Sequence, residues 1–474
     1  MSIKMAIKQT ISYNSNSEYF AGFLQDIVKK SEIVGEVSQN KNNIVLLLDD
    51  SDKNAIERFS NNAQKFMPHS IFLGNIDTKN EDININKASL ESKNYNISLC
   101  PKCLDKLTNP SSPNYLDDTI VCNHYSNKET LKLEDKHVYS PHYREGDALL
   151  VVDSSKLNKL FIMTEDEIKT LLSIEKPTIK VTIKDEDLKE ITGKNYIKIK
   201  SPNTIKATMT ALNAKDGELE YLFFEQLDTL RVTTLQGNVL VIKDTLNISN
   251  SLENMNEDKV LNRFLNISKE AGFNEAIGVN LSEKNGISFL VSNKKDTKYA
   301  LKFGEFKLAD VIEQMKVDDK KQKLLVNFEK KYPKIIEEFE NNPEYNLFET
   351  LSCVFELKGR DFENVSDKSL EFRGNGGLKI DTFFNEDGFD YVSFLGSIMS
   401  FKLAGTDDHY LAYSTFEALA DMAISTLGQL KTKYKIDNFV MMGNMFENTV
   451  VHSRIVSKFS LSNPYFSKGT AIDD

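Results

Sequence analysis

Apolar positions along the first eighty residues follow two different periods. Residues 5–12 alternate polar and apolar side chains, whereas Tyr19, Phe20, Phe23 and Ile27 recur at the spacing of a helix. The predicted elements are strands at 5–12, 33–38, 44–48 and 71–76, and helices at 17–30 and 52–66. This order, β-α-β-β-α-β, predicts a split βαβ or ferredoxin-like domain.

After a polar, asparagine-rich stretch at residues 79–96, which is typical of a linker, the pattern predicts mixed helices and strands. Expected helices lie at 164–172, 259–271, 308–315 and 320–331, and expected strands at 179–183, 196–199, 221–224, 239–242 and 439–442. A longer helix at 411–430 carries an apolar stripe that should pack against a sheet: Phe416, Leu419, Ala420, Ala423, Ile424 and Leu427. A new unit is expected near residue 230. The predicted fold class is α+β with several domains.

Length and charge narrow the class of protein. The chain has 474 residues, too many for a single hydrophobic core, so three or four domains are expected. Its net charge of −11 argues against nucleic acid as a partner, because phosphate binding needs a basic face. We expect no signal peptide and no membrane insertion, since long apolar runs are missing. Few cysteines, mostly clustered, predict a reducing cytoplasm and no disulfide framework.

Three of the four cysteines lie close together in the sequence. Cys100 and Cys103 form a CxxC pair, which points two thiolates into one tetrahedron, and Cys122 begins a second half-site across a loop. A full zinc ribbon would repeat CxxC, but Tyr125 stands at the place of the last cysteine. The prediction is one structural zinc held by three thiolates and one histidine. The fourth ligand is expected to be His124, with His137 and His142 as alternatives. The competing interpretation is a ribbon that has lost its metal.

A predicted strand, turn and helix near residue 443 is the second candidate site. Gly443 and Asn444 follow the strand at 439–442, so backbone N–H groups at the turn and at the helix start can hold a phosphate. An ordinary tight turn is the alternative. Residues 373–377, Arg-Gly-Asn-Gly-Gly, can also wrap a phosphate, but a lone glycine cluster favours a hairpin turn. Cys353 lies in an apolar stretch and is expected to be a buried core thiol.

Several segments, taken in order, resemble the HypF family of carbamoyltransferases, which start cyanide-ligand synthesis for nickel–iron hydrogenases. Residues 439–448, Phe-Val-Met-Met-Gly-Asn-Met-Phe-Glu-Asn, resemble the family's strand and SGGVFQN turn. Shorter pieces resemble the zinc region, the YrdC-like domain and the early C-terminal domain: residues 100–104 and 121–125, 164–177, and 248–254. The resemblance implies an acylphosphatase-like domain at 1–78, a zinc-ribbon-like segment at 97–145, a reduced YrdC-like domain at 146–226 and a TsaD-like ASKHA domain at 230–474.

The chain departs from this family at the residues that carry its chemistry. The family's acylphosphatase-like domain needs an arginine at the start of its first helix, and Ala21 stands at the matching position. Its catalytic asparagine has at best Gln39 or Asn40 as a counterpart. The histidine cluster of the TsaD-like domain is missing, because no histidine lies between His142 and His409. The nucleotide turn of the family implies four candidate ATP-binding residues: Gly443, Asn444, Glu447 and Asn448.

The resemblance and the departures together imply a shortened, motif-degenerate relative of HypF, similar to HydE-type proteins. The expected role is an accessory factor in hydrogenase maturation that binds the hydrogenase large subunit or other maturation proteins. Zinc is the expected cofactor. One alternative is an ATP-dependent carbamoyltransferase that receives carbamate or adenylate from elsewhere. A second is a zinc-stabilised interaction module unrelated to hydrogenase.

Overall fold

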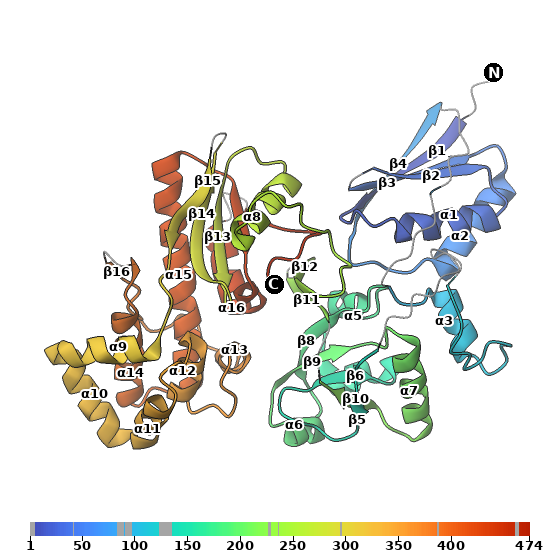
Figure 1. Ribbon diagram of the computed structural model, residues 1–474. Helices are drawn as coiled ribbons and strands as arrows, with labels where there is room; N and C mark the ends of the chain where they lie inside the picture. The colour runs from blue at the N-terminus through green and yellow to red at the C-terminus, as the bar shows by residue number, and fades with distance from the viewer. Residues whose placement is uncertain are drawn as a thin grey trace. The chain divides into compact units, whose positions relative to one another are not determined.

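The computed structural model describes residues 5–40, 42–82, 90, 97–122, 135–225, 229–235, 237–293, 296–385, 388–459 and 464–474. The chain divides into two compact units, each with helices and sheets (Figure 1). Unit 1 comprises Met1–Ser251, Lys468–Ile472 and Asp474, and unit 2 comprises Leu252–Ser467 and Asp473. The predicted class, mixed α and β with several sheets, is confirmed. The finer division into four domains stays a prediction.

Unit 1 begins with a four-stranded antiparallel sheet in the strand order β2-β3-β1-β4. Its strands are β1 (Met5–Tyr13), β2 (Gly35–Asn40), β3 (Asn43–Asp49) and β4 (Leu73–Asp82), and its helices are α1 (Tyr19–Lys30) and α2 (Lys53–Phe66). Asp52 caps α2 by accepting hydrogen bonds from two backbone N–H groups of the first turn. The element order predicted from the sequence, and the pairing of a split βαβ arrangement, are both observed.

A second sheet of eight strands follows in unit 1, in the order β12-β11-β8-β9-β6-β10-β5 with β7 paired to β8. Its strands are β5 (Tyr139–Ser140), β6 (Ala148–Val151), β7 (Phe161–Ile162), β8 (Thr178–Ile183), β9 (Tyr196–Lys200), β10 (Tyr221–Phe224), β11 (Leu230–Leu235) and β12 (Asn238–Asp244). The helices of this part are α3 (Pro101–Thr108), α4 (Leu157–Leu160), α5 (Glu165–Leu171), α6 (Glu186–Thr192) and α7 (Ile205–Asp216).

The hairpin β11–β12 belongs to unit 1, whereas the sequence predicted a new unit near residue 230. Arg231 of β11 pairs with Thr178 of β8 in parallel, which extends the eight-stranded sheet. The buried side chains of Val232 and Val241 join the same apolar core as Ile179. Burial of this hairpin against β8 therefore keeps it in unit 1, whose N-terminal segment runs to Ser251.

Unit 2 is built on a five-stranded sheet in the order β15-β14-β13-β18-β19. Its strands are β13 (Ala276–Ser282), β14 (Gly286–Ser292), β15 (Thr297–Lys302), β18 (Phe439–Met442) and β19 (Pro464–Phe466). The first three are antiparallel neighbours, while β13, β18 and β19 run parallel. In addition, β16 (Phe384–Asn385) pairs antiparallel with β17 (Gly388–Phe389).

Helices of unit 2 pack on this sheet and on one another (Figure 1). They are α8 (Lys259–Glu270), α9 (Leu308–Val317), α10 (Asp319–Lys331), α11 (Pro333–Asn341), α12 (Leu347–Val354), α13 (Phe362–Leu370), α14 (Tyr391–Leu403), α15 (Asp408–Tyr434) and α16 (Thr449–Lys458). Helix α15 contacts β13, α13, α14 and α16. All predicted stripe residues of α15 are buried except Ile424, which is half-buried. Cys353 of α12 is a buried core thiol, as predicted.

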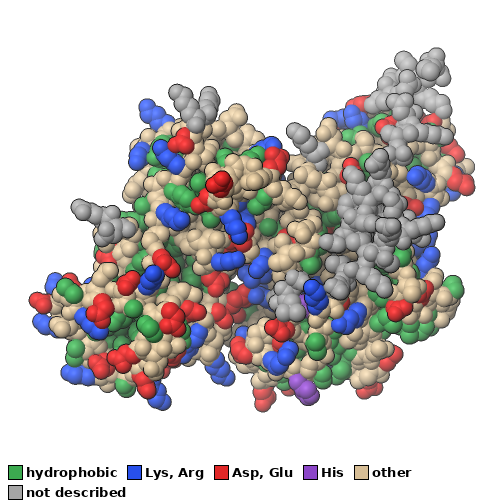
Figure 2. All heavy atoms as spheres, viewed as in Figure 1, with side chains coloured by type: hydrophobic (Ala, Val, Ile, Leu, Met, Phe, Trp, Pro, Cys, Tyr) green, Lys and Arg blue, Asp and Glu red, His purple; other side chains and the backbone are tan. Residues whose placement is uncertain are grey.

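The described surface mixes both signs of charge. In the view of Figure 2, acidic and basic side chains are interspersed over the described residues. Among the helices of the described chain, none combines the length and the apolar character needed to cross a bilayer.

Candidate functional site

The three clustered cysteines meet in unit 1. Cys100 precedes α3 and Cys103 lies in its first turn, while Cys122 returns after the loop that follows this helix. Their sulfur atoms all lie within 4.8 Å of one another, and all three side chains are buried. The Sγ of Cys100 accepts a hydrogen bond of 3.4 Å from the backbone N–H of Cys103. Residues separated by a loop in the sequence thus form one group of metal-ligating atoms.

The donor set of this group fits a thiophilic cation. Zn–S bonds of about 2.3 Å place sulfurs of a tetrahedral site roughly 3.8 Å apart, which is compatible with the observed spread. The pKa of Cys100 is raised by hydrogen bonds with Cys103 and Cys122 and then by burial. The hydrogen bond with Cys100 lowers the pKa of Cys103, but the hydrogen bond with Cys122 and burial raise it to about 12. Thiols with a raised pKa stay protonated by themselves, and a bound cation reverses that balance because it stabilises each thiolate. Cys100, Cys103 and Cys122 would supply three of four zinc ligands.

The expected fourth ligand, His124, lies outside the described residues. Of the two alternatives, His137 is buried, and its Nδ1 lies 2.9 Å from the carbonyl oxygen of Glu225. His142 is exposed. Within the described ranges, neither His137 nor His142 belongs to the group of ligand atoms around the three sulfurs. His124 therefore stays the predicted fourth ligand.

Gly443 sits at the sharp turn after β18, where only glycine fits. Its φ is 104°, and a Cβ built on it would lie 2.1 Å from the carbonyl oxygen of Leu281 in the neighbouring strand β13. The backbone N–H of Asn444 donates a hydrogen bond of 2.7 Å to Asp473 Oδ2. The side-chain oxygen of Asn444 accepts from the backbone N–H of Glu283 at 2.9 Å. The turn predicted as a phosphate site is therefore engaged with groups of unit 2 itself.

Asn448 and Glu447, the other two candidates, are buried. Asn448 is 1% exposed, and its side-chain oxygen accepts from the N–H of Val450, so it caps α16. Its amide nitrogen donates to the hydroxyls of Ser366 and Ser369 of α13, both at 2.9 Å. Glu447 ends the 3-10 turn η2 (Asn444–Glu447) and is 8% exposed. The four candidates are neighbours in space, but Asn448 faces the protein core.

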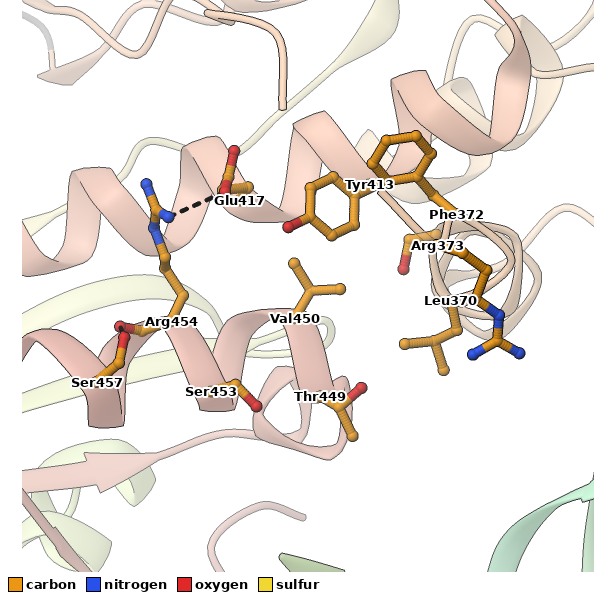
Figure 3. Close-up of a pocket in the computed structure, with 11 residues that line it drawn as sticks. Leu370, Phe372, Arg373, Tyr413, Glu417, Thr449, Val450, Ser453, Arg454 and Ser457 are labelled. Atoms are coloured by element: carbon orange, nitrogen blue, oxygen red, sulfur yellow. Dashed lines mark hydrogen bonds and ion pairs between the residues drawn. The ribbon is translucent and has the colours of Figure 1, made fainter. Parts of the chain in front are cut away.

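A cavity of about 450 Å³ in unit 2 is lined by residues of α13, α15 and α16 and of the loop after α13, and the sequence did not predict it. Figure 3 shows Tyr413 and Phe372 on one side, and Val450, Ser453 and Thr449 of α16 on the other. The remaining lining residues are Ser369, Leu370, Arg373, Glu417, Arg454 and Ser457. Aromatic faces, hydroxyls and two guanidinium groups around one hollow can hold a small polar ligand. The single sequence signal for it is the arginine of the stretch at 373–377.

The glycine stretch at 373–377 is an irregular loop after α13, so the predicted hairpin turn is wrong. Gly377 N–H donates to Glu417 Oε2, and a Cβ on Gly377 would lie 2.8 Å from the Cα of Ser414. Glu417 also forms an ion pair with Arg454 of α16 at 3.1 Å (Figure 3). Hydrogen bonds to Asp421 and the negative charges of Asp421 and Glu417 raise the pKa of Arg454. The loop is thus held against α15.

The loop between β1 and α1 is closed by other parts of unit 1. The amide nitrogen of Gln39 donates to the carbonyl oxygens of Ser15 and Ser17, at 2.8 and 3.3 Å. The backbone N–H of Asn16 donates to Asn250 Oδ1 at 2.7 Å. Ala21, the predicted counterpart of the family's arginine, is fully buried. Asn40, the other predicted counterpart of the family's asparagine, is exposed.

The remaining histidines of unit 2 lie apart from any described metal-ligating group. His409 is half-buried, with its ring 6.0 Å from that of Phe372. His452 is 5% exposed and packs on Phe466, with ring centroids 5.0 Å apart. Burial lowers the pKa of His452 to about 4. It is a core histidine, neutral at physiological pH.

This chain is similar to a curated protein in sequence and to HypF in structure. No protein-family model matches the sequence. The chain is similar to Protein HydE of Wolinella succinogenes, with 21% identity over 375 residues that cover 69% of this chain. The match spans 65% of that relative, which is less than two thirds of its length.

In structure, HypF from T. kodakarensis matches with a TM-score of 0.65 at 13% identity, over 100% of this chain and 97% of that one. Full-length HypF in a phosphate- and nucleotide-bound form matches with a TM-score of 0.56 at 11% identity, over the same shares of the two chains, 100% and 97%. The resemblance to HypF predicted from the sequence is confirmed, and this chain has the fold of HypF.

Proposed function

We propose that this protein is an accessory factor in the maturation of nickel–iron hydrogenases. It works in the cytoplasm by binding the hydrogenase large subunit or other maturation proteins, and it does not transfer carbamoyl groups unaided. The fold of HypF over the whole chain and the sequence similarity to HydE support a role in this process. The hydrogen bonds that close the loop between β1 and α1 support a binding role over a catalytic one.

That loop carries the proposal. An acyl-phosphate site needs unengaged backbone N–H groups and an arginine to hold the phosphate. Here the backbone N–H of Asn16 donates a hydrogen bond to the side chain of Asn250. The side-chain amide of Gln39 donates to a backbone carbonyl oxygen of the loop, and Ala21 is buried and brings no charge. A Cβ on Gly469 would lie 1.9 Å from the carbonyl oxygen of Asn14, so the chain also packs tightly over the loop. These contacts support the proposal that the loop does not hold the acyl phosphate of carbamoyl transfer.

The HypF fold also suggests which domain of a HypF-type carbamoyltransferase each sheet of this chain corresponds to. We assign the four-stranded sheet to an acylphosphatase-like domain and the cysteine segment to a zinc-ribbon-like remnant with one structural zinc. The eight-stranded sheet corresponds to a reduced YrdC-like domain, and unit 2 to a TsaD-like domain. On this assignment the protein keeps the domain order of a carbamoyltransferase as a scaffold for protein contacts.

Deletion of the gene in the native host tests the accessory role. The deletion strain should lose most hydrogenase activity in a viologen assay and accumulate unprocessed large subunit. Wild-type protein and the surface variant Lys379→Ala should both restore it. Normal hydrogenase activity in the deletion strain would contradict the proposal. A tagged chain should also co-purify the large subunit or a maturation protein, and a pull-down that returns neither would favour an interaction module unrelated to hydrogenase.

The cavity in unit 2 favours one second candidate, an ATP-dependent carbamoyltransferase. Aromatic Phe372 and Tyr413, with Arg373 and Arg454 nearby, offer stacking and charge to a nucleotide (Figure 3). Calorimetry with magnesium ATP should then give heat that Arg373→Ala abolishes and Lys379→Ala leaves intact. Because Asn448 is buried, Arg373 is the sharper test. No heat with wild-type protein discards this candidate.

A further inference from the structure

A second cavity, of about 320 Å³, lies beside the cysteine group of unit 1. It is lined by residues of α3 and of the loop that follows this helix, with Cys103 and Lys106 among them. All three clustered cysteines are buried, but Cys103 is the one that belongs to the lining of this cavity. A small molecule that enters the cavity therefore meets Cys103 before it can reach Cys100 or Cys122.

The loop side of this cavity is polar and held in place by its own hydrogen bonds. Asp117, a lining residue, accepts from the side-chain amide of Asn114 at 3.1 Å and from the hydroxyl of Thr119 at 2.6 Å. Polar cavities hold water and small polar molecules, whereas apolar cavities stay dry, and the volume of this one is many times that of a water molecule, about 30 Å³. A small polar oxidant such as a hydroperoxide therefore has both the space and the surroundings to enter.

Two further thiols lie next to the sulfur of Cys103. The three sulfur atoms all lie within 4.8 Å of one another. Cys100 caps α3, Cys103 lies in the first turn, and the Sγ of Cys100 accepts from the backbone N–H of Cys103 at 3.4 Å. A CxxC pair at the start of a helix is also the arrangement of proteins whose paired thiols form a reversible disulfide. Once Cys103 is oxidised, a neighbouring sulfur can therefore attack it.

We propose that Cys103 is an oxidation site through which hydroperoxides release the metal of the cysteine group. The thiolate of Cys103 attacks one oxygen of hydrogen peroxide, so an S–O bond forms, the O–O bond breaks, and the departing hydroxide takes a proton from solvent to become water. The thiolate of Cys100 or Cys122 then attacks the sulfenic sulfur. An S–S bond forms, and the second hydroxide also leaves as water. Two thiolates lose two electrons, and one peroxide is reduced to two waters.

Oxidation in this way empties the metal site. One disulfide removes two of the three thiolates, and zinc in a structural site is held by four ligands. Reduction by a dithiol restores the thiolates and allows the metal to bind again. The cysteine group thereby couples metal content to the presence of peroxide. This inference goes beyond the proposed accessory role and does not depend on it, because the chemistry concerns the cysteine group alone.

Hydrogen peroxide added to the full chain loaded with zinc tests this. A chromogenic chelator follows zinc release, and peptide mass spectrometry after alkylation of the free thiols maps the oxidised residues. Zinc should leave at the rate at which Cys103 enters a disulfide with Cys100 or Cys122, and a dithiol with added zinc should reverse both changes. Cys353, a buried thiol outside the group, should stay reduced.

Matched variants test the route through the cavity. Lys106 is exposed and lines it, whereas Asp105 is exposed and is not among the lining residues. Lys106→Trp should narrow the cavity and slow the oxidation of Cys103 several-fold, and Asp105→Trp should keep the wild-type rate. Among metal-free chains, Cys103→Ser should lose thiols to peroxide several-fold more slowly than Cys100→Ser, which keeps the thiol beside the cavity.

Three results would overturn the proposal. The first is oxidation that begins with a disulfide between Cys100 and Cys122. The second is zinc that stays bound after Cys103 has been oxidised, or a wild-type chain that takes up no zinc. The third is equal reactivity of the metal-free Cys103→Ser and Cys100→Ser chains, a comparison that remains decisive if Lys106→Trp fails to fold.

Discussion

The side-chain nitrogen of Asn448 lies 2.9 Å from the hydroxyl oxygen of Ser369, a residue that lines the cavity of unit 2. The same nitrogen reaches the hydroxyl of Ser366, while the Asn448 oxygen caps α16 through Val450. One amide therefore joins α13 to α16 on the inner wall of the cavity. Its position makes Asn448 a structural link between two helices, although its sequence motif suggests nucleotide contact.

Asn448→Ala should lower the free energy of unfolding by about 2–3 kcal/mol. It removes a helix cap, worth about 1 kcal/mol, and leaves buried hydroxyls without a donor, which costs about 1–2 kcal/mol more. Urea denaturation measures the change. Asn54→Ala, in the first turn of α2, is the control and should cost well under 1 kcal/mol, the usual scale of a surface substitution. Equal stability of the Asn448 variant and wild type would contradict the structural role.

Gly443→Ala should be among the most damaging single changes in unit 2. Its φ of 104° is strained for any side chain, and the new Cβ would lie 2.1 Å from Leu281 O. Gly405 offers a matched control, because it has a φ of 87° and nothing within 4 Å of a built Cβ. Gly405→Ala should cost about 1 kcal/mol, and Gly443→Ala at least about 3 kcal/mol. Similar melting temperatures of the two variants would rule out the close approach.

One zinc per chain should accompany the purified protein. Cys103→Ser removes one of three converging thiolates, so the metal content should fall below about one tenth of wild type, in line with the ligand count that zinc requires. Elemental analysis measures this, and Cys353→Ser, a buried thiol outside the group, should keep its zinc. A metal-free wild type whose melting temperature is unchanged by chelator would mean that the cysteine group is vestigial.

Acid should destabilise unit 2 through His452. Burial lowers its pKa to about 4 in the folded state, while an unfolded histidine titrates near about 6.5. The folded form binds fewer protons, so this contribution to stability is present above about pH 6.5 and is lost as pH falls toward about 4, amounting to about 3 kcal/mol.

Unfolding free energies from pH 7.5 to 4.5 should therefore show a shallower decline in His452→Phe than in wild type. The substitution His409→Gln, at a half-buried site, serves as control and should keep the wild-type slope. If His452→Phe retains that slope as well, the pKa of His452 is not lowered in the folded state.

The elements of the N-terminal sheet and helix α15 could be predicted because their apolar residues recur at the regular spacing of a strand or a helix along the chain. One-sided burial imposes alternation on β3 and an apolar stripe on α15. The central hairpin of unit 2 was missed for the opposite reason. Every residue of β13 is buried and β14 is buried from its second residue, so both faces of this hairpin are covered in the fold. Buried polar residues such as Asn280 and Ser288 interrupt both strands, so the sequence shows no long apolar run there.

The sequence by itself determined the order of local elements, the spacing of the CxxC pair and the presence of an alanine, not an arginine, at position 21. These follow from neighbours along the chain. Only the tertiary structure decided that Asn448 turns inward to Ser366 and that Asp473 reaches Asn444. Such contacts join residues far apart in sequence, and packing of β13, β18, α13 and α16 fixes them. No local period encodes a hydrogen bond between segments that meet only after the core has formed.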